Sequence, residues 1–137
     1  ALQILLLILS FFIFTACDEK SNNNFKTIEQ INEISQDKLT LLFLSKPGCK
    51  WCLKQKNDFK EKNYIKKYPQ YDFIKIESDE KLFSQILKIK DLNLQSFPTL
   101  VLIQRDNQDL IILEKLEGYI QPDILEPFLE FNKDLLK

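Results

Sequence analysis

The sequence predicts an α/β domain in which a central mixed β-sheet of about four strands is flanked by helices. Helical and strand-like segments alternate through most of the chain, which is typical of parallel strands joined by helical crossovers. Two apolar runs after Pro98 are separated by a short polar turn, which predicts an antiparallel hairpin. The chain has 137 residues, 45% of them hydrophobic, which suits one domain with a single core.

The first elements of the domain are expected to be an amphipathic helix and a buried strand. Isoleucines recur every three residues through 28–34, and Thr27 with Gln30 fits a capping box. We therefore expect a short helix over this segment. The run from Leu39 to Leu44 is continuously apolar apart from one Thr, which predicts a central strand that is covered on both faces.

The middle of the chain is expected to add two helices and one strand. A helical pattern begins near Cys49 and continues to about Tyr64, ahead of Pro69. Residues 71–77 mix β-branched and aromatic side chains at strand length, and residues 79–91 return to helical spacing. The order of these elements places the two strands parallel to each other.

The last third of the domain is expected to be a hairpin followed by a helix. Strands over 99–104 and 110–116 flank the polar turn 105–108. Pro122 suits the first turn of the final helix, whereas Pro127 predicts a kink or a late start. The expected apolar stripe of this helix consists of Ile124, Leu125, Phe128, Leu129 and Leu135.

The N-terminal segment differs sharply in composition from the rest of the chain. Residues 1–16 carry no charge, and their apolar run is shorter than the ~20 residues needed to span a bilayer. This pattern predicts an export signal, and because the chain contains no Met we expect it to be truncated at its N-terminus. Export to an oxidising compartment would make a disulfide plausible.

Phe14-Thr15-Ala16-Cys17 resembles the lipobox of bacterial lipoproteins, although Phe14 stands where an aliphatic residue is usual. The resemblance implies lipidation of Cys17 as the new N-terminus; the alternative is a free Cys in an uncleaved anchor. We therefore expect a signal peptide of lipoprotein type at 1–16, a flexible tether at 17–26 and a domain at 27–137.

The pattern Cys49-Lys50-Trp51-Cys52 is the main chemical feature of the domain. Thiols three residues apart share one helical face and can close a small disulfide ring, and a helix N-terminus favours the thiolate. Lysines without any acid nearby add positive charge, at positions 46, 50, 54 and 56. A redox dithiol, a structural disulfide and a metal ligand pair all remain open from these two residues alone.

Composition excludes several other kinds of site. The chain has no His, which removes most catalytic zinc sites and His-dependent nucleophiles. Its three Cys are fewer than the four that a thiolate-only zinc site needs. A net charge of −1 gives no general attraction to nucleic acid. We expect no metal or cofactor other than a redox-active Cys49–Cys52 disulfide.

Residues 27–136 resemble the thioredoxin superfamily, and within it exported bacterial thioredoxin-like proteins. The resemblance rests on the segment 45–52, on Ser96-Phe97-Pro98-Thr99-Leu100 and on Gly118-Tyr119. It implies a thioredoxin-like fold and a thiol–disulfide oxidoreductase.

The resemblance also implies roles for individual residues. Cys49 would be the exposed nucleophile and Cys52 the buried thiol that resolves the mixed disulfide. Pro98 would be a cis-proline facing the dithiol, and the Phe97 backbone would pair with an extended substrate. From their positions inside the motif rather than from the resemblance, Lys50 and Trp51 are expected to contact substrate; Trp51 could instead shield the thiols or pack beside the helix.

Two positions depart from the family pattern. Phe43 stands where thioredoxin carries a buried acid that assists proton transfer to the resolving thiol, and Gly48 stands where thioredoxin has Trp. The proton carrier is therefore unassigned. Lys75 could face the site from the neighbouring strand, but we expect it to face solvent.

Together these observations predict an exported, periplasmic or cell-surface oxidoreductase, lipid-anchored to a bacterial membrane. Its expected partners are protein or peptide thiols and disulfides, a membrane-bound redox partner and the membrane, with no nucleic acid. The alternative is a non-catalytic thioredoxin-fold module that delivers Cu(I) or captures extended segments like a chaperone.

Overall fold

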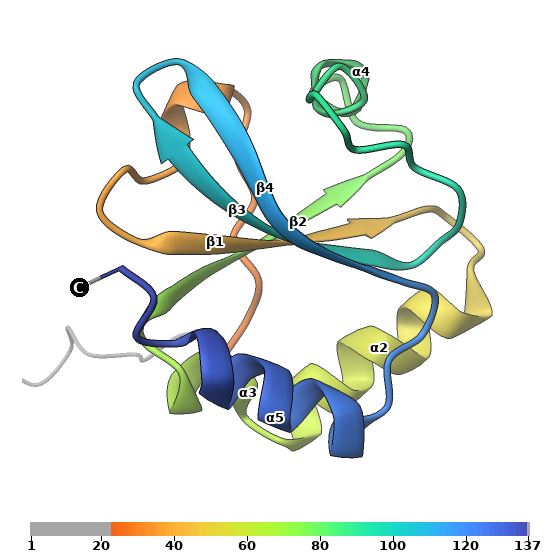
Figure 1. Ribbon diagram of the computed structural model, residues 1–137. Helices are drawn as coiled ribbons and strands as arrows, with labels where there is room; N and C mark the ends of the chain where they lie inside the picture. Colours follow the sequence, from red (N-terminus) through yellow and green to blue (C-terminus); the bar gives the residue numbers. More distant parts are fainter. Residues whose placement is uncertain (1–22, 137) are drawn as a thin grey trace, which may run out of the picture.

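The computed structural model describes residues 23–136 and has at its centre a four-stranded mixed sheet of order β2-β1-β3-β4 (Figure 1). Strand β1 (Leu39–Ser45) pairs in parallel with β2 (Tyr71–Glu77). On its other side β1 pairs antiparallel with β3 (Thr99–Asp106), which forms a hairpin with β4 (Asp109–Glu117). The expected mixed sheet flanked by helices is confirmed.

Helices cover both faces of this sheet (Figure 1). On one face lie α2 (Lys50–Glu61), α3 (Tyr64–Lys67) and α5 (Pro122–Asn132). On the other lie α4 (Phe83–Ile86) and the short 3-10 helix η1 (Ile31–Glu33). No helix within residues 23–136 is long and apolar enough to cross a bilayer.

Side chains that alternate along β1 contribute to two hydrophobic cores, one on each face of the sheet. Leu41 and Phe43 pack on the side of α2 and α5, whereas Leu42 and Leu44 pack on the side of α4. All seven residues of β1 are buried, as the continuous apolar run predicts for a central strand. The end of β1 therefore delivers the following loop directly to the N-terminus of α2.

The helix expected over 27–34 is wrong, because only η1 forms there. Ile28 and Ile34 are buried against the α4 side of the sheet, so a three-residue spacing is satisfied by one tight 3-10 turn. The capping box uses Gln30 and Glu33 rather than Thr27 and Gln30. An apolar period of three does not distinguish such a turn from an α-helix.

Residues 23–26, which we expected to belong to the flexible tether, pack against the domain instead. The backbone N–H of Lys26 donates to the carbonyl of Phe73 at 2.8 Å, which adds a short parallel bridge beside β2. Phe25 packs its ring among the aromatic side chains of the α2-side core. Residues 23–26 thus pack with the domain despite their polar composition, because the Phe25 ring is held in the aromatic core.

The helix expected over 79–91 is also much shorter than predicted. Only α4 forms, and successive turns surround it. Leu82 and Ile86 reach the core, as the spacing requires, but Asp91 and Asn93 adopt positive φ values of 68° and 41°. On both sides of α4 the backbone N–H groups bond to carbonyls three residues back, as Lys88 does to Gln85 and Ile89 to Ile86, so the apolar positions are held by turns rather than by one helix.

The two long helices follow the prediction more closely. Helix α2 begins after Cys49 and ends before Asn63, whose φ of 55° separates it from α3. Helix α5 begins at Pro122 and contains Pro127, so the late start is wrong. Of its expected stripe, Ile124 and Leu135 are both 53% exposed, whereas Leu125 and Leu129 are buried.

Candidate active site

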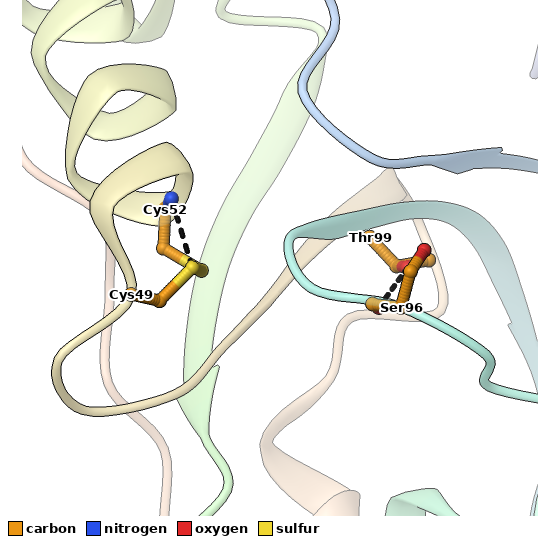
Figure 2. The surroundings of a disulfide bond; sticks show 4 residues. All are labelled: Cys49, Cys52, Ser96 and Thr99. Atoms are coloured by element: carbon orange, nitrogen blue, oxygen red, sulfur yellow. Dashed lines mark hydrogen bonds between the residues drawn. A yellow bond between two sulfur atoms is a disulfide. The ribbon is translucent and has the colours of Figure 1, made fainter.

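The two cysteines form a disulfide at the beginning of α2 (Figure 2). Their Cα atoms lie 5.2 Å apart, within the ordinary range for a disulfide. Cys49 is the N-cap of α2, and its Sγ accepts a hydrogen bond of 3.1 Å from the backbone N–H of Cys52. When the bond is reduced, the same N–H and the helix dipole are placed to stabilise a thiolate on Cys49.

The two sulfurs differ in accessibility. Cys49 is partly exposed, whereas Cys52 is only 3% exposed and belongs to the core between the sheet and α2. An external thiol or disulfide can therefore reach Cys49 first. Burial in apolar surroundings disfavours a thiolate on Cys52.

The backbone before Cys49 needs a glycine. Gly48 has a φ of 72°, in the left-handed region that other residues enter only with strain. A Cβ at this position would meet nothing within 4 Å, so the requirement comes from the backbone and not from space. The turn lets the chain leave β1 and start α2 with Cys49 at the cap.

The loop before β3 carries the second expected motif. The Phe97–Pro98 peptide bond is cis, and Pro98 is buried. The Thr99 hydroxyl donates to the carbonyl of Ser96 at 2.7 Å (Figure 2), and the N–H of Gly118 donates to the carbonyl of Pro98 at 2.8 Å. These bonds hold the turn against the end of β4.

A cation–π contact joins this loop to the cysteine loop. The Nζ of Lys46 lies 5.5 Å from the centre of the Phe97 ring. Phe97 and Cys49 both pack against the core that contains Cys52. The structure thus brings the two motifs together.

Trp51 lies on the exposed side of α2 and packs on Tyr119. Its side chain is 50% exposed, and the two ring centroids are 5.6 Å apart. The Nζ atoms of Lys50 and Lys54 lie 5.9 and 5.5 Å from the Trp51 ring centre, and Lys54 also lies 4.9 Å from Tyr119. The result is an exposed aromatic surface with positive charge beside the disulfide.

Tyr119 is held in place by α2. Its hydroxyl donates to the Asp58 carboxylate. Burial first, and then this hydrogen bond and the negative charge of Asp58, raise the pKa of Tyr119 to about 12. The sequence motif contained Tyr119, but no role followed from the residue alone.

A pocket of about 360 Å³ lies beside the disulfide. Cys49, Cys52 and Phe43 line it together with Lys75 and Glu77 from β2. The Nζ of Lys75 lies 3.5 Å from Glu77 Oε1, and the Lys75 side chain is only 20% exposed. The expectation that Lys75 faces solvent is therefore wrong, since its side chain is turned into this pocket.

Sequence reasoning missed Glu77 altogether, although the sequence held a signal for it. Phe73 is buried on the α2 side of the sheet, and residues two apart on a strand share a face. Counting on from Phe73 places Lys75 and Glu77 on the face that also receives Cys52. The predicted strand 71–77 is confirmed, and Glu77 is its last residue.

Two further expectations concern residues and ligands outside this geometry. Cys17 and the segment 1–16 lie outside the described residues, so lipidation and export stay predictions. Among residues 23–136, no three side chains of His, Cys, Asp or Glu gather closely enough to hold a metal ion.

The mixed sheet and the Cys49–Cys52 pair together support a thiol–disulfide oxidoreductase in general terms. A family model described as "Thioredoxin-like domain" matches residues 26–133, and the chain belongs to this family. No curated protein matches the sequence significantly.

Solved thioredoxins share the fold. Thioredoxin from Trichomonas vaginalis superposes with a TM-score of 0.62 at 14% identity, covering 80% of this chain and 98% of that one. Thioredoxin from Malassezia sympodialis gives 0.64 at 16% identity, covering 82% and 93%. Oxidised mitochondrial thioredoxin 3 from Saccharomyces cerevisiae gives 0.59 at 22% identity, covering 78% and 94%. At these identities the likeness concerns the fold alone.

Proposed function

We propose that this protein is an exported, lipid-anchored oxidoreductase that reduces or interchanges disulfides in other proteins. One observation carries the proposal: an accessible Cys49 caps the helix in which its buried partner Cys52 lies. A structural disulfide gains little from a ring this short, because the stabilisation grows with loop length. A pair with one reachable sulfur suits exchange better than stapling.

The reaction starts from the reduced pair. The Cys49 thiolate attacks one sulfur of a substrate disulfide, forms a mixed disulfide and releases the other sulfur as a thiolate. Cys52 then loses its proton and attacks Cys49 Sγ, so that the Cys49–substrate bond breaks and its electron pair leaves on the second substrate sulfur. The substrate gains two electrons and two protons, and the enzyme ends as the disulfide.

Four residues are proposed to contact the substrate around Cys49. An extended substrate segment would pair with the Phe97 backbone beside Pro98, as an added strand. Trp51 and Lys50 would contact side chains of the same segment, since Trp51 is half-exposed and Lys50 is exposed beside it. The positive charge favours segments that carry acidic residues.

Lipidation of Cys17 and a membrane-bound redox partner belong to the same proposal. They are supported by the uncharged segment 1–16 and by the resemblance of Phe14-Thr15-Ala16-Cys17 to a lipobox. A periplasmic or cell-surface location follows from both. We favour reduction or interchange over oxidation on family resemblance, with a membrane partner that returns electrons to the disulfide.

The first experiment is a redox titration followed by fluorescence. Trp51 is the sole Trp, so its emission reports on the adjacent pair. We expect a reversible two-electron transition above the roughly −300 mV typical of structural disulfides, and its loss in Cys49→Ser and Cys52→Ser. A pair that is reduced only after unfolding would contradict catalysis.

The second experiment traps the intermediate. Cys52→Ser cannot resolve a mixed disulfide, so this variant should accumulate substrate proteins on Cys49, and reducing agent should release them. Both variants carry Cys17→Ser as well, so that Cys17 cannot react. Cys49→Ser is the matched control and should trap none, since the thiol of Cys52 is buried. If neither variant traps substrate, the proposed oxidoreductase function is wrong. The alternative, a non-catalytic module that binds Cu(I) or extended segments, is then favoured.

A further inference from the structure

We propose that Glu77, paired with Lys75, is the general base that takes the proton from Cys52 when the mixed disulfide is resolved. The inference rests on the proposed function and assigns a group to a step which that function requires. Glu77 lies on β2, the strand next to β1, and is far from the cysteines in the sequence.

The need for such a base comes from the surroundings of Cys52. Its side chain is 3% exposed, and the core around it is apolar. Phe43, on the same face of the sheet, is an apolar side chain without ionisable atoms. Burial disfavours the thiolate that resolution requires, so a base near Cys52 would accelerate the step.

The strand register places Glu77 on the correct face. In the parallel pair, Phe43 is opposite Lys75, and Ser45 is opposite Glu77. Side chains two residues apart share a face, so the core position of Phe43 fixes the direction of Lys75 and Glu77 as well. Both side chains therefore point toward the N-terminus of α2, where Cys52 lies.

The pocket beside the disulfide connects the two groups. Cys52, Lys75 and Glu77 all line its volume of about 360 Å³. A water needs only about 10–15 Å³, so one or two waters can carry a proton from the thiol to the carboxylate. In the described part of the chain, Glu77 is the only carboxylate among the lining residues of this pocket.

Charged groups from four segments surround Glu77. Lys46 in the loop after β1, Lys50 and Lys56 on α2 and Lys75 on β2 line the same pocket. Behind Glu77, in the turn after β2, the Glu80 carboxylate accepts a hydrogen bond from the Glu77 backbone N–H. Lys75 is the one in ion-pair distance, at 3.5 Å. Because the Lys75 side chain is 20% exposed and that of Glu77 34%, the pair is partly shielded from water and holds the carboxylate at the pocket.

The step balances in protons and electrons. The Cys52 thiol gives its proton, through water, to the Glu77 carboxylate, and the resulting thiolate attacks Cys49 Sγ. The bond between Cys49 and the substrate breaks, and its electron pair leaves on the substrate sulfur. Glu77 then returns the proton through the pocket to that leaving thiolate, or to water.

The test separates the two chemical steps with an aromatic disulfide, dithiobis(nitrobenzoate), reacted with the reduced full chain. Every variant carries Cys17→Ser so that only the Cys49–Cys52 pair reacts. The attack of Cys49 releases one coloured thiolate, and the attack of Cys52 releases the second, so stopped-flow absorbance shows two phases. The first phase measures the nucleophile and the second measures resolution.

Glu77→Gln should slow the second phase roughly 100-fold, the low end of what a general base contributes, and leave the first phase within about twofold. The rate of its second phase should also rise about tenfold for each pH unit, as expected when hydroxide must replace the base. Glu77→Asp should restore part of the rate. The matched control is Glu117→Gln, which removes the carboxylate of the Lys115–Glu117 pair on β4, also two residues apart on a strand.

Whether Glu77→Gln slows or accelerates the two phases distinguishes a general base from a carboxylate that acts only through its negative charge. A carboxylate that acted only through its charge would disfavour both thiolates, so its removal would accelerate both phases. That outcome, or a second phase equal to that of Glu117→Gln, would overturn the proposal. Circular dichroism and thermal unfolding check that each variant is folded. If the parent chain shows no first phase, the proposed function itself fails, independently of Glu77.

Discussion

Gln55, a side chain on α2 with 0% exposure, binds both backbone polar groups of Ile120. Its Oε1 accepts from the Ile120 N–H at 2.8 Å, and its Nε2 donates to the Ile120 carbonyl at 3.1 Å. The segment between β4 and α5 is thereby fixed along α2. This contact sets the position of the adjacent Tyr119 against Trp51 on the surface beside the disulfide.

Replacing Gln55 by Leu should destabilise the protein substantially. The substitution leaves two partly buried backbone groups of Ile120 without their partners. A fully buried unpaired group costs about 1–3 kcal/mol, so we expect a loss toward the low end of that range for each. Urea unfolding of the oxidised form would measure the loss. The control Gln70→Leu changes an exposed residue and should stay within about 0.5 kcal/mol. Equal stabilities for the two variants would contradict the role of Gln55.

The contact between Tyr119 and Asp58 predicts a pH dependence. Burial and the Asp58 carboxylate raise the pKa of Tyr119 from 10.0 to about 12, which favours the neutral phenol in the folded state. The stabilisation is complete below pH 10 and is lost as the pH rises from there toward 12. Asp58→Asn should therefore move the ionisation of Tyr119 to lower pH.

Trp51 provides the measurement for this ionisation. It packs on Tyr119 with ring centroids 5.6 Å apart, so tyrosinate formation should quench its emission. The midpoint of quenching should fall in Asp58→Asn, and the transition should vanish in Tyr119→Phe. A midpoint that Asp58→Asn leaves unchanged would show that the hydrogen bond has no influence on the pKa.

Gly48 should resist substitution by Ala because of its backbone alone. Its φ of 72° is left-handed, and forcing an ordinary residue into this region costs about 1–2 kcal/mol. Gly48→Asn should lose less, since Asn tolerates left-handed backbone better. Thermal unfolding of both variants, oxidised and reduced, measures the difference. If Ala is as stable as Gly, the turn before Cys49 is free to relax.

Trp51→Ala should weaken substrate capture without a comparable loss of stability. The side chain is 50% exposed, so its removal deletes exposed aromatic surface rather than core. In the Cys52→Ser background, the rate of mixed-disulfide formation with a protein substrate should fall about tenfold, or about 1.4 kcal/mol. Leu87→Ala, which removes a 49% exposed apolar side chain near α4, is the control. Equal rates for the two would remove Trp51 from the substrate site.

The sheet and the cysteine helix were predictable because their patterns have one structural solution. A continuous apolar run such as 39–44 suits a strand covered on both faces, and residues 110–116 after a polar turn suit a hairpin. The helices predicted over 27–34 and 79–91 are wrong because the apolar spacing in these segments has more than one structural solution. Apolar residues three or four positions apart fit a 3-10 turn, an α-helix or successive turns, and only contacts with the sheet decide among them.

By itself, the sequence determined the fold class and the chemistry of the pair. Both follow from local patterns: the order of helices and strands, and two thiols three residues apart at a helix start. Only the tertiary structure decided what surrounds the pair. Parallel pairing of β1 with β2 brings Lys75 and Glu77 to the pocket beside Cys52, and Gln55 brings Tyr119 to Trp51. Such contacts join residues distant in the chain, so no local pattern specifies them.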